Sequence, residues 1–263
     1  MANQRMNLAL EKAKPSVSVI TVCFNSIRTL RATLESVAEQ TLKNIEHIVI
    51  DGGSTDGTLE LIKGHKAGLA QVISEHDFGI YDAMNKGLAR ATGDIVCFLN
   101  ADDAYAHPNV LKNIAVLIAS KKLDAVFGDV AFFNPERPSQ TTRRYRSEYF
   151  TPQSIAYGWM PAHPALFLRR AVYQRVGPFK TNYRIAGDFE FIARAFGRGE
   201  LRSQYVPEVL VRMRAGGVST AGWRSKVLLN KEVLRACREN GIRTNIFKIL
   251  SKYPLKLLEI WRR

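Results

Sequence analysis

The first half of the chain alternates between short runs rich in Val, Ile and Phe and longer segments whose apolar residues recur at helical spacing. Strands that alternate with helices of this length form parallel crossover units, and ligands of such sheets bind beyond the carboxyl ends of the strands. The pattern therefore predicts an α/β domain with a mostly parallel sheet flanked by helices. The expected strands are residues 17–24, 46–50, 71–74, 94–99 and 124–133, and the expected helices are residues 28–40, 56–65, 80–91 and 109–120.

The pattern is less regular after residue 133, where Pro135 and Pro138 predict a loop. From residue 245 an apolar stripe runs beside basic residues. We therefore expect a main domain of residues 1–220 and a helical, basic C-terminal extension of residues 221–263. Regular periodicity in this half predicts a helix at residues 188–196, a strand at 204–212 and a long helix at 223–239.

Composition excludes several classes of protein. Of the 263 residues, 46% are hydrophobic and 24% are charged, so the chain can bury a core and is not of disordered composition. No apolar run reaches the roughly 18 residues of a membrane span. The start MANQRMNLALEKAKPS lacks the apolar core of a signal peptide, so we expect a cytoplasmic protein. The three scattered cysteines argue against a disulfide framework and a zinc site.

The formal net charge of +14 is confined to the later part of the chain. Residues 1–103 carry 10 Lys and Arg against 13 Asp and Glu, whereas residues 104–221 carry 17 against 8 and residues 222–263 carry 11 against 3. The second half is therefore expected to face an anionic partner. A membrane surface, a phosphate-bearing substrate and nucleic acid all fit this charge.

Acidic residues follow two of the expected strands, Asp51 after the second and Asp102 with Asp103 after the fourth. Carboxylates gathered at one edge of a sheet repel one another unless a cation or hydrogen-bond donors compensate them, and oxygen ligands favour Mg²⁺ or Mn²⁺. A single Asp before a helix is more often an N-terminal cap, and we assign that role to Asp56. One cap does not explain two adjacent charges, so we predict a metal site at Asp102 and Asp103.

Four stretches, VSVITVCFN, IVIDGGSTDGT, DFGIYDAMNKGLARATGDIVCFLNADD and AGDFEF, resemble the motifs of the family 2 glycosyltransferases in their order and spacing. The resemblance runs from about residue 15 to about residue 213, and is particularly to bacterial enzymes that build O-antigen and other surface polysaccharides. It implies a GT-A (Rossmann-like) fold and an inverting glycosyltransferase. The implied substrates are a nucleotide-sugar donor, usually a UDP-sugar, and the implied cofactor is Mn²⁺ or Mg²⁺.

The resemblance also assigns a donor site. Val22, Phe24 and Asn25 match a first-strand motif in which an aromatic residue packs on the base, although Phe24 also fits a core position. Asp51 matches the aspartate that accepts a hydrogen bond from the imide of the base. Asn85 matches a helix position beside the nucleotide, but the arginine that commonly precedes it is replaced by Met84, and Lys86 is a possible substitute.

Asn100, Ala101 and Asp102 resemble the DxD motif of the family with its first Asp replaced by Asn. The first position mainly bonds the ribose and the third binds the metal, so the resemblance keeps Asp102 as a ligand. Asp103 is then either a second ligand or a hydrogen-bonding partner of the first.

Asp188, in AGDFEF, matches the catalytic base, a position that by itself would suit an N-terminal helix cap. His163 stands where related enzymes often carry a histidine near the sugar or the acceptor, although a lone His between two prolines is more often structural. The implied reaction is a single displacement: Asp188 takes the proton of an acceptor hydroxyl as that oxygen attacks the anomeric carbon.

Acceptors in the resembled enzymes are often sugars on a polyprenyl diphosphate at the inner membrane face. Such an acceptor fits the basic second half, so a peripheral association with the cytoplasmic membrane face is an alternative to a solvated helix surface.

Two other functions fit part of the sequence. A nucleic-acid-binding protein would explain the positive charge but not the strand-end aspartates. A nucleotidyltransferase of similar fold would need a Gly-rich loop after the first strand, where this chain has NSIRT.

For an association with the membrane surface, the residues suited to anionic headgroups are Arg143, Arg144, Arg146, Lys248, Lys252, Lys256, Arg262 and Arg263.

Overall fold

The computed structural model describes residues 15–65, 68–134, 136–214 and 222–253. The strands are β1 Val17–Cys23, β2 Ile45–Asp51, β3 Gln71–Ser74, β4 Ile95–Phe98, β5 Asp103–Tyr105, β6 Ala125–Asn134, β7 Arg137–Tyr145, β8 Leu166–Arg169 and β9 Ser203–Arg214. The helices are α2 Leu30–Ala38, α3 Thr58–Gly64, α4 Ile80–Leu88, α5 Val110–Ser120, α6 Arg170–Val176, α7 Gly187–Phe196, α8 Gly222–Glu239 and α9 Ile246–Leu250, with 3-10 turns η2 Pro152–Tyr157 and η3 His163–Ala165.

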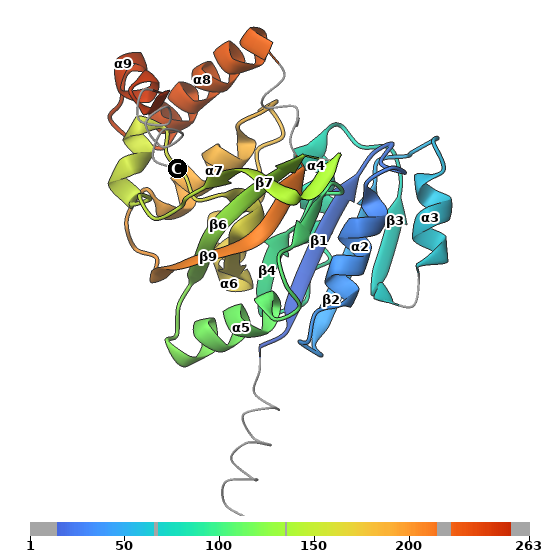
Figure 1. The fold of residues 1–263 in the computed structure, drawn as a ribbon. Coiled ribbons are helices and arrows are strands. Elements are labelled where there is room, and N and C mark those ends of the chain that lie inside the picture. The colour runs from blue at the N-terminus through green and yellow to red at the C-terminus, as the bar shows by residue number, and fades with distance from the viewer. Residues whose placement is uncertain (1–14, 66–67, 135, 215–221, 254–263) are drawn as a thin grey trace, which may run out of the picture.

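All nine strands of the described residues belong to one sheet, in the order β3-β2-β1-β4-β8-β6-β9-β5, with β7 paired to β6 (Figure 1). Parallel ladders join β3, β2, β1 and β4, and another joins β6 to β9. Antiparallel ladders connect β8 to β4 and β6, β7 to β6, and β5 to β9. The predicted α/β class, with helices flanking the sheet, is confirmed.

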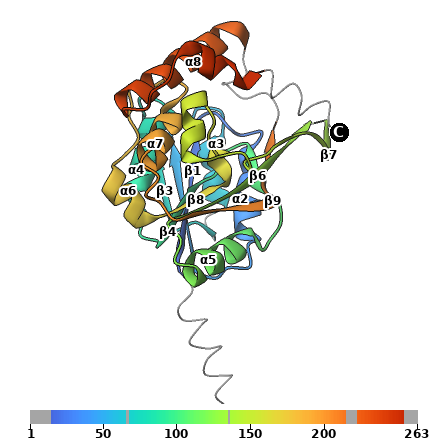
Figure 2. The ribbon, with the colours of Figure 1, turned by 90° about the vertical axis from the view of Figure 1, so that its left-hand side faces the viewer.

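The pleat of β1 explains why helices cover both faces of the sheet. Ile20 and Val22 point into an apolar cluster shared with α4, α6 and α7, whereas Val17 and Val19 point into a cluster shared with α5. Successive strand residues point to opposite faces, so a strand that is buried on both sides reads as one apolar run. Figure 2 shows α4, α6 and α7 together on one side of the sheet.

The second half differs from its prediction. Of the two prolines expected in a loop, Pro135 lies outside the described residues, whereas Pro138 lies in β7, which starts at Arg137 and pairs with β6. Proline is tolerated at such an edge because no second neighbour needs its missing N–H. Strands β5 and β8 and helix α6, of three, four and seven residues, were not predicted.

The helical C-terminal extension is present and packs against α7. Its residues Val233, Ala236, Cys237 and Ile249 are buried in the same apolar cluster as Phe196 at the end of α7. The extension therefore shares a core with the helix that carries Asp188.

The close packing of α4 on the sheet gives a test of the fold. A Cβ atom at Gly87 would collide with the Ile20 side chain and lie 3.3 Å from Ile50, whereas a Cβ at Gly64 meets nothing. We expect Gly87→Ala to lower the free energy of unfolding by about 1–3 kcal/mol, the usual cost of overpacking. We expect Gly64→Ala to raise it by roughly 0.5 kcal/mol, because the unfolded chain loses freedom. Urea unfolding measures both, and equal values would contradict this packing.

Candidate active site

The four parallel strands bring their carboxyl ends to one edge of the sheet. In the registers of β1 with β2 and of β2 with β3, Cys23 lies beside Asp51 and Asp51 beside Ser74. On the other side of β1, Ile20 lies beside Phe98, so residues 100–103 follow at the same edge. Phe24, Asn25, Asp51 and the segment from Asn100 to Asp103, all predicted from the sequence, therefore share one rim.

Asp51 is fully buried, and donors surround its carboxylate. Ser54 donates its N–H at 3.1 Å and its hydroxyl at 2.5 Å, and Ser74 donates its hydroxyl at 2.6 Å. These bonds compensate a charge that would otherwise be costly to bury.

The turn after β2 is fastened to the end of β1. Asn25 has a left-handed backbone with φ 48°, a conformation that Asn tolerates. Its N–H donates to the Ser54 hydroxyl at 2.7 Å, and its side-chain oxygen accepts from the Thr55 N–H at 3.0 Å. The N-cap of α3 is Gly57 and not Asp56 as predicted, but the Asp56 carboxylate accepts from the N–H of Thr58, the first residue of the helix, at 3.1 Å.

A further carboxylate at this rim, Asp77, was missed in the sequence. A Cβ at Gly52 would collide with the Asp77 carboxylate and lie 3.5 Å from the Phe24 ring, so these two side chains approach each other over the bare backbone of Gly52. The Phe24 ring is 60% exposed, which rules out a core role. The position three residues beyond β3 was the available signal, because Asp51 and Asp102 also follow parallel strands.

Asp102 and Asp103 differ in environment. Asp102 is half-buried, and burial raises its carboxyl pKa while Arg214 lowers it. Asp103 begins β5 and is buried, with no hydrogen bond to either carboxylate oxygen among the described residues. Burial first, and the neighbouring Asp102 charge second, raise the pKa of Asp103 well above its usual range.

An orphaned carboxylate beside a second one fits a divalent cation, which would compensate both charges. In the described part of the chain no group of three or more His, Cys, Asp or Glu side chains could hold a metal. Two carboxylates therefore leave further ligand positions to phosphate oxygens and water, the usual situation for Mg²⁺.

Asp188 lies in the first turn of α7 and is partly exposed. Burial raises its carboxyl pKa to about 6, although its bonds from the Phe189 N–H at 2.8 Å and the Tyr81 hydroxyl at 3.5 Å oppose this shift. Tyr81 stands in the first turn of α4, the helix that follows β3. Through Tyr81, the second half of the chain thus brings Asp188 next to the rim.

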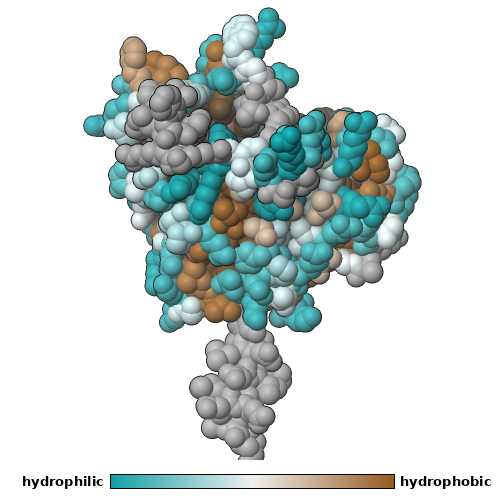
Figure 3. All heavy atoms as spheres, viewed as in Figure 1, coloured by the Kyte–Doolittle hydropathy of each residue, from teal (hydrophilic) through white to brown (hydrophobic). Residues whose placement is uncertain are grey.

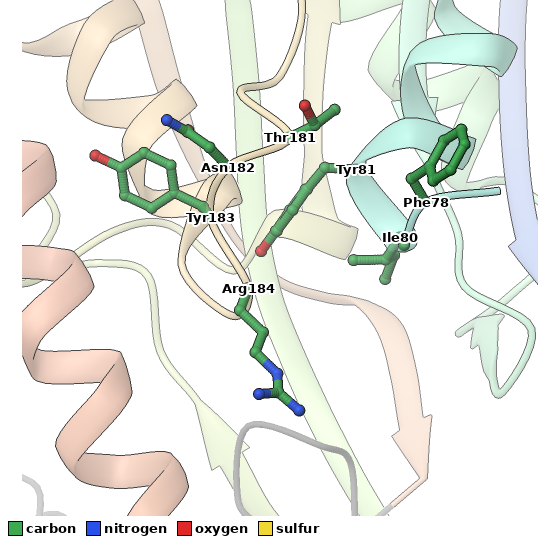
Figure 4. Close-up of a pocket in the computed structure, with 8 residues that line it drawn as sticks. Phe78, Ile80, Tyr81, Thr181, Asn182, Tyr183 and Arg184 are labelled. Atoms are coloured by element: carbon green, nitrogen blue, oxygen red, sulfur yellow. The ribbon is translucent and has the colours of Figure 1, made fainter.

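An open hollow of about 260 Å³ lies beside Tyr81, between the start of α4 and the loop before α7 (Figure 4). Figure 4 shows Phe78 and Arg184 on different sides of the Tyr81 ring. Phe78 is 85% exposed, and the Arg184 guanidinium has no hydrogen-bond or ion-pair partner within the described ranges. Tyr81, which lines this hollow, bonds Asp188 through its hydroxyl.

Other predicted site residues have structural contacts. Asn85 donates to the Phe179 carbonyl and accepts from the Phe179 N–H, both at 2.8 Å. The Lys86 ammonium bonds the His76 carbonyl and pairs with Glu75 and Asp82. Neither side chain is directed to a phosphate by these contacts.

His163 is buried between Phe98 and Phe179, with ring centroids 5.5 and 5.8 Å away, and burial lowers its pKa to about 4. It is therefore neutral and packed in an aromatic cluster. Val22 and Ala101 are buried as well, so only their backbone can contact a ligand.

The profile of the family described as glycosyl transferase family 2 matches residues 18–177, more than half of the chain. The chain therefore belongs to this family, and it is a glycosyltransferase. The PGL/p-HBAD biosynthesis glycosyltransferase of Mycobacterium bovis is 31% identical over 227 residues, which cover 85% of this chain and 84% of that protein. An uncharacterised glycosyltransferase of Mycobacterium tuberculosis is 35% identical over 69% of each chain.

Solved structures confirm the GT-A fold. TarS residues 1–349 of S. aureus in complex with UDP-GlcNAc has a TM-score of 0.64 at 20% identity, covering 83% of this chain and 66% of that one. The mannosyltransferase PcManGT of Pyrobaculum calidifontis, in complex with GDP-Man and Mn²⁺, has a TM-score of 0.62 at 22% identity, covering 86% and 66%. The chain spans 40% of the longer TarS chain that it also matches.

Proposed function

We propose that this glycosyltransferase moves a sugar, with inversion, from a nucleotide diphosphate donor to a hydroxyl of a glycan or of a polyprenyl-diphosphate-linked acceptor in bacterial surface polysaccharide synthesis. One observation carries this proposal: a partly exposed carboxyl with a raised pKa, Asp188, accepts from the hydroxyl of Tyr81, which stands at the start of α4, the helix that follows β3. UDP is the proposed nucleotide, since TarS is known in complex with UDP and with UDP-GlcNAc.

On the donor side, the exposed Phe24 ring offers a stacking surface for the base, and Asp51 or Asp77 offers an acceptor for its N–H group. Asn25 and Asn100 present polar groups at the same rim. Asn85 is proposed to act indirectly, by holding α4 against residue 179. His163 remains a prediction, supported only by its place in the aromatic cluster beneath the rim.

Asp102 and Asp103 would hold Mn²⁺ or Mg²⁺, and such an ion would supply electrostatic stabilisation to the departing nucleotide diphosphate. Asp188 accepts the proton of the acceptor hydroxyl as that oxygen forms the new glycosidic bond and the donor's anomeric carbon–oxygen bond breaks. A base has to be ionised to do so, and a pKa of about 6 leaves it mostly ionised near neutral pH.

The donor site is tested by thermal shift with UDP, UDP-GlcNAc, UDP-glucose and GDP-mannose, each with and without Mn²⁺. We expect UDP with Mn²⁺ to stabilise the wild type by several degrees, since saturating ligand at about 100 times Kd contributes ~2.7 kcal/mol. Asp102→Ala should lose this shift. Asp94→Ala, at the amino edge where Asp94 accepts from the Ser16 N–H, should keep it. An undiminished shift in Asp102→Ala would remove Asp102 from the site.

The base is tested with Asp188→Asn. We expect UDP binding to persist and sugar transfer to fall by about 10²- to 10⁴-fold, the usual contribution of a general base. Asp124→Asn, which alters a carboxylate that accepts from the Arg202 N–H at the amino edge, should keep its activity. Release of pyrophosphate in place of UDP would instead favour a nucleotidyltransferase.

The pH dependence of stability is a second readout for Asp188. Its pKa rises from 3.8 to about 6 on folding, so the carboxyl destabilises the folded state increasingly as pH rises from about 4 to about 6. Asp188→Asn should therefore be more stable than the wild type at pH 7.5 and lose most of this advantage at pH 4.5. An advantage independent of pH would contradict the raised pKa.

We also propose that the C-terminal extension rests on an anionic membrane surface at the cytoplasmic face. None of the described helices is long and apolar enough to cross a membrane. On α9, Phe247 is 80% exposed and Leu250 is 41% exposed, and Figure 3 shows apolar surface where α9 lies in Figure 1. Lys248 adds positive charge beside them. Such a mixture of aromatic and basic side chains suits a headgroup interface.

Two of the basic residues named for this role are engaged inside the protein. Arg144 pairs with the buried Asp129 at 2.7 Å, and Lys252 is only 4% exposed. Lys256, Arg262 and Arg263 lie outside the described residues.

Cosedimentation with vesicles tests the membrane proposal. We expect the wild type to bind vesicles of phosphatidylglycerol more strongly than vesicles of phosphatidylcholine, and Phe247→Ser to reduce binding several-fold because the apolar contact is lost. Phe78→Ser, which removes an equally exposed ring elsewhere, should bind as the wild type does. Equal binding of the two lipids, or an equal loss in both variants, would contradict the proposal.

A further inference from the structure

A buried carboxylate on the C-terminal extension contacts the segment that leads into α7. Glu232, on α8, is 8% exposed. Its carboxylate accepts three consecutive backbone N–H groups: Arg184 at 2.8 Å, Ile185 at 2.9 Å and Ala186 at 2.8 Å. Three donors compensate the charge, and hydrogen bonds to an ionised acceptor are among the strongest in proteins.

This contact supplies what the local sequence lacks. Helix α7 begins after Ala186, which has no side-chain oxygen, and no side-chain cap bond is present there. The N–H groups at the start of a helix have no partner within the helix, and negative charge is favourable at this end. Glu232, 46 positions further along the chain, accepts from the N–H of Ala186, the N-cap residue, and places a negative charge at this end of α7.

The segment is also held from the opposite side. The Tyr81 hydroxyl donates to the Ile185 carbonyl at 2.7 Å and reaches Asp188 at 3.5 Å. Thus Glu232 fixes the N–H of Ile185 and Tyr81 fixes its carbonyl. Gly187 allows this, since a Cβ there would lie 2.7 Å from the Tyr81 ring.

We propose that Glu232 is a positioning residue for the glycosyl transfer: by fixing the backbone of residues 184–186, the C-terminal extension sets the place and orientation of the Asp188 carboxylate. This inference rests on the proposed role of Asp188 as the base. The charged and titratable groups that face Asp188 are Tyr81 from α4 and Glu232 from α8, with the Phe189 N–H from its own helix.

The backbone contact is tested without any activity. Glu232→Gln keeps the size of the side chain but removes the charge and one acceptor, and Glu232→Asp keeps the charge but shortens the reach. We expect amide hydrogen exchange of residues 184–186 to become at least about tenfold faster in both variants, corresponding to about 1.4 kcal/mol. The control is Glu46→Gln, because Glu46 also accepts three bonds, from Ser18 and Thr92, at the amino edge of the sheet. Unchanged exchange in both Glu232 variants would overturn the proposal.

The catalytic consequence is read from UDP release with the donor that gives the largest thermal shift. We expect kcat to fall on the order of 10- to 100-fold in Glu232→Gln with UDP binding unchanged, since a small misplacement of a reacting group costs this much. The acidic limb of the pH profile should also move to lower pH, because the Glu232 charge raises the pKa of Asp188. Wild-type kcat in both Glu232 variants while Asp188→Asn is inactive would sink this inference alone. Full activity of Asp188→Asn would instead sink the proposed function.

Discussion

The site depends on the parallel pairing of four strands, β3, β2, β1 and β4. This pairing brings four strand ends with polar side chains to one edge of the sheet. Carboxylates at such an edge lose water when the chain folds, and the charge of each is compensated in a different way. Asp51 has two serine hydroxyls and an N–H, whereas no described residue bonds the Asp103 carboxylate. A fully bonded carboxylate stabilises a fixed turn, while an orphaned one is stable only if a proton or a cation joins it. Differences in hydrogen bonding thus separate a structural acid from a candidate ligand.

The sequence predicted the elements whose signal is local. Strands β1 and β4 are buried throughout and are rich in Val, Ile and Phe, and the first-half helices show clear periodicity. Asp51 and Asp102 could be found because they directly follow such runs. Glu232 could not be found, since its partners lie 46 to 48 residues away and nothing in the sequence of α8 distinguishes it from a solvated glutamate. The approach of Asp77 to Phe24 needed coordinates for a similar reason, because the packing around Gly52 brings the two side chains together.

Residues that match a family motif are not all used in the same way. Asn85 occupies both sides of its amide with the Phe179 backbone, and Gly87 is bare because Ile20 lies against it. Both residues help α4 pack against its neighbours. Packing is therefore as good a reason for their place in the motif as contact with a donor would be. Packing also explains Gly187, which makes room for the Tyr81 ring. Helix α4 therefore connects the edge of the sheet to the loop before Asp188 through Tyr81.

The position of Asp188 depends on elements from three regions of the chain. Its own helix provides only the Phe189 N–H, α4 provides Tyr81, and α8 holds the backbone just ahead of it. Burial raises the pKa of the Asp188 carboxyl, so its ionised form is costly. Contacts that fix its position therefore have to act without neutralising its charge. Bonds from Glu232 to the backbone, in place of bonds to Asp188 itself, meet that requirement. The family profile ends at residue 177, so α7 and α8, which arrange the surroundings of Asp188, lie beyond the residues that the profile matches.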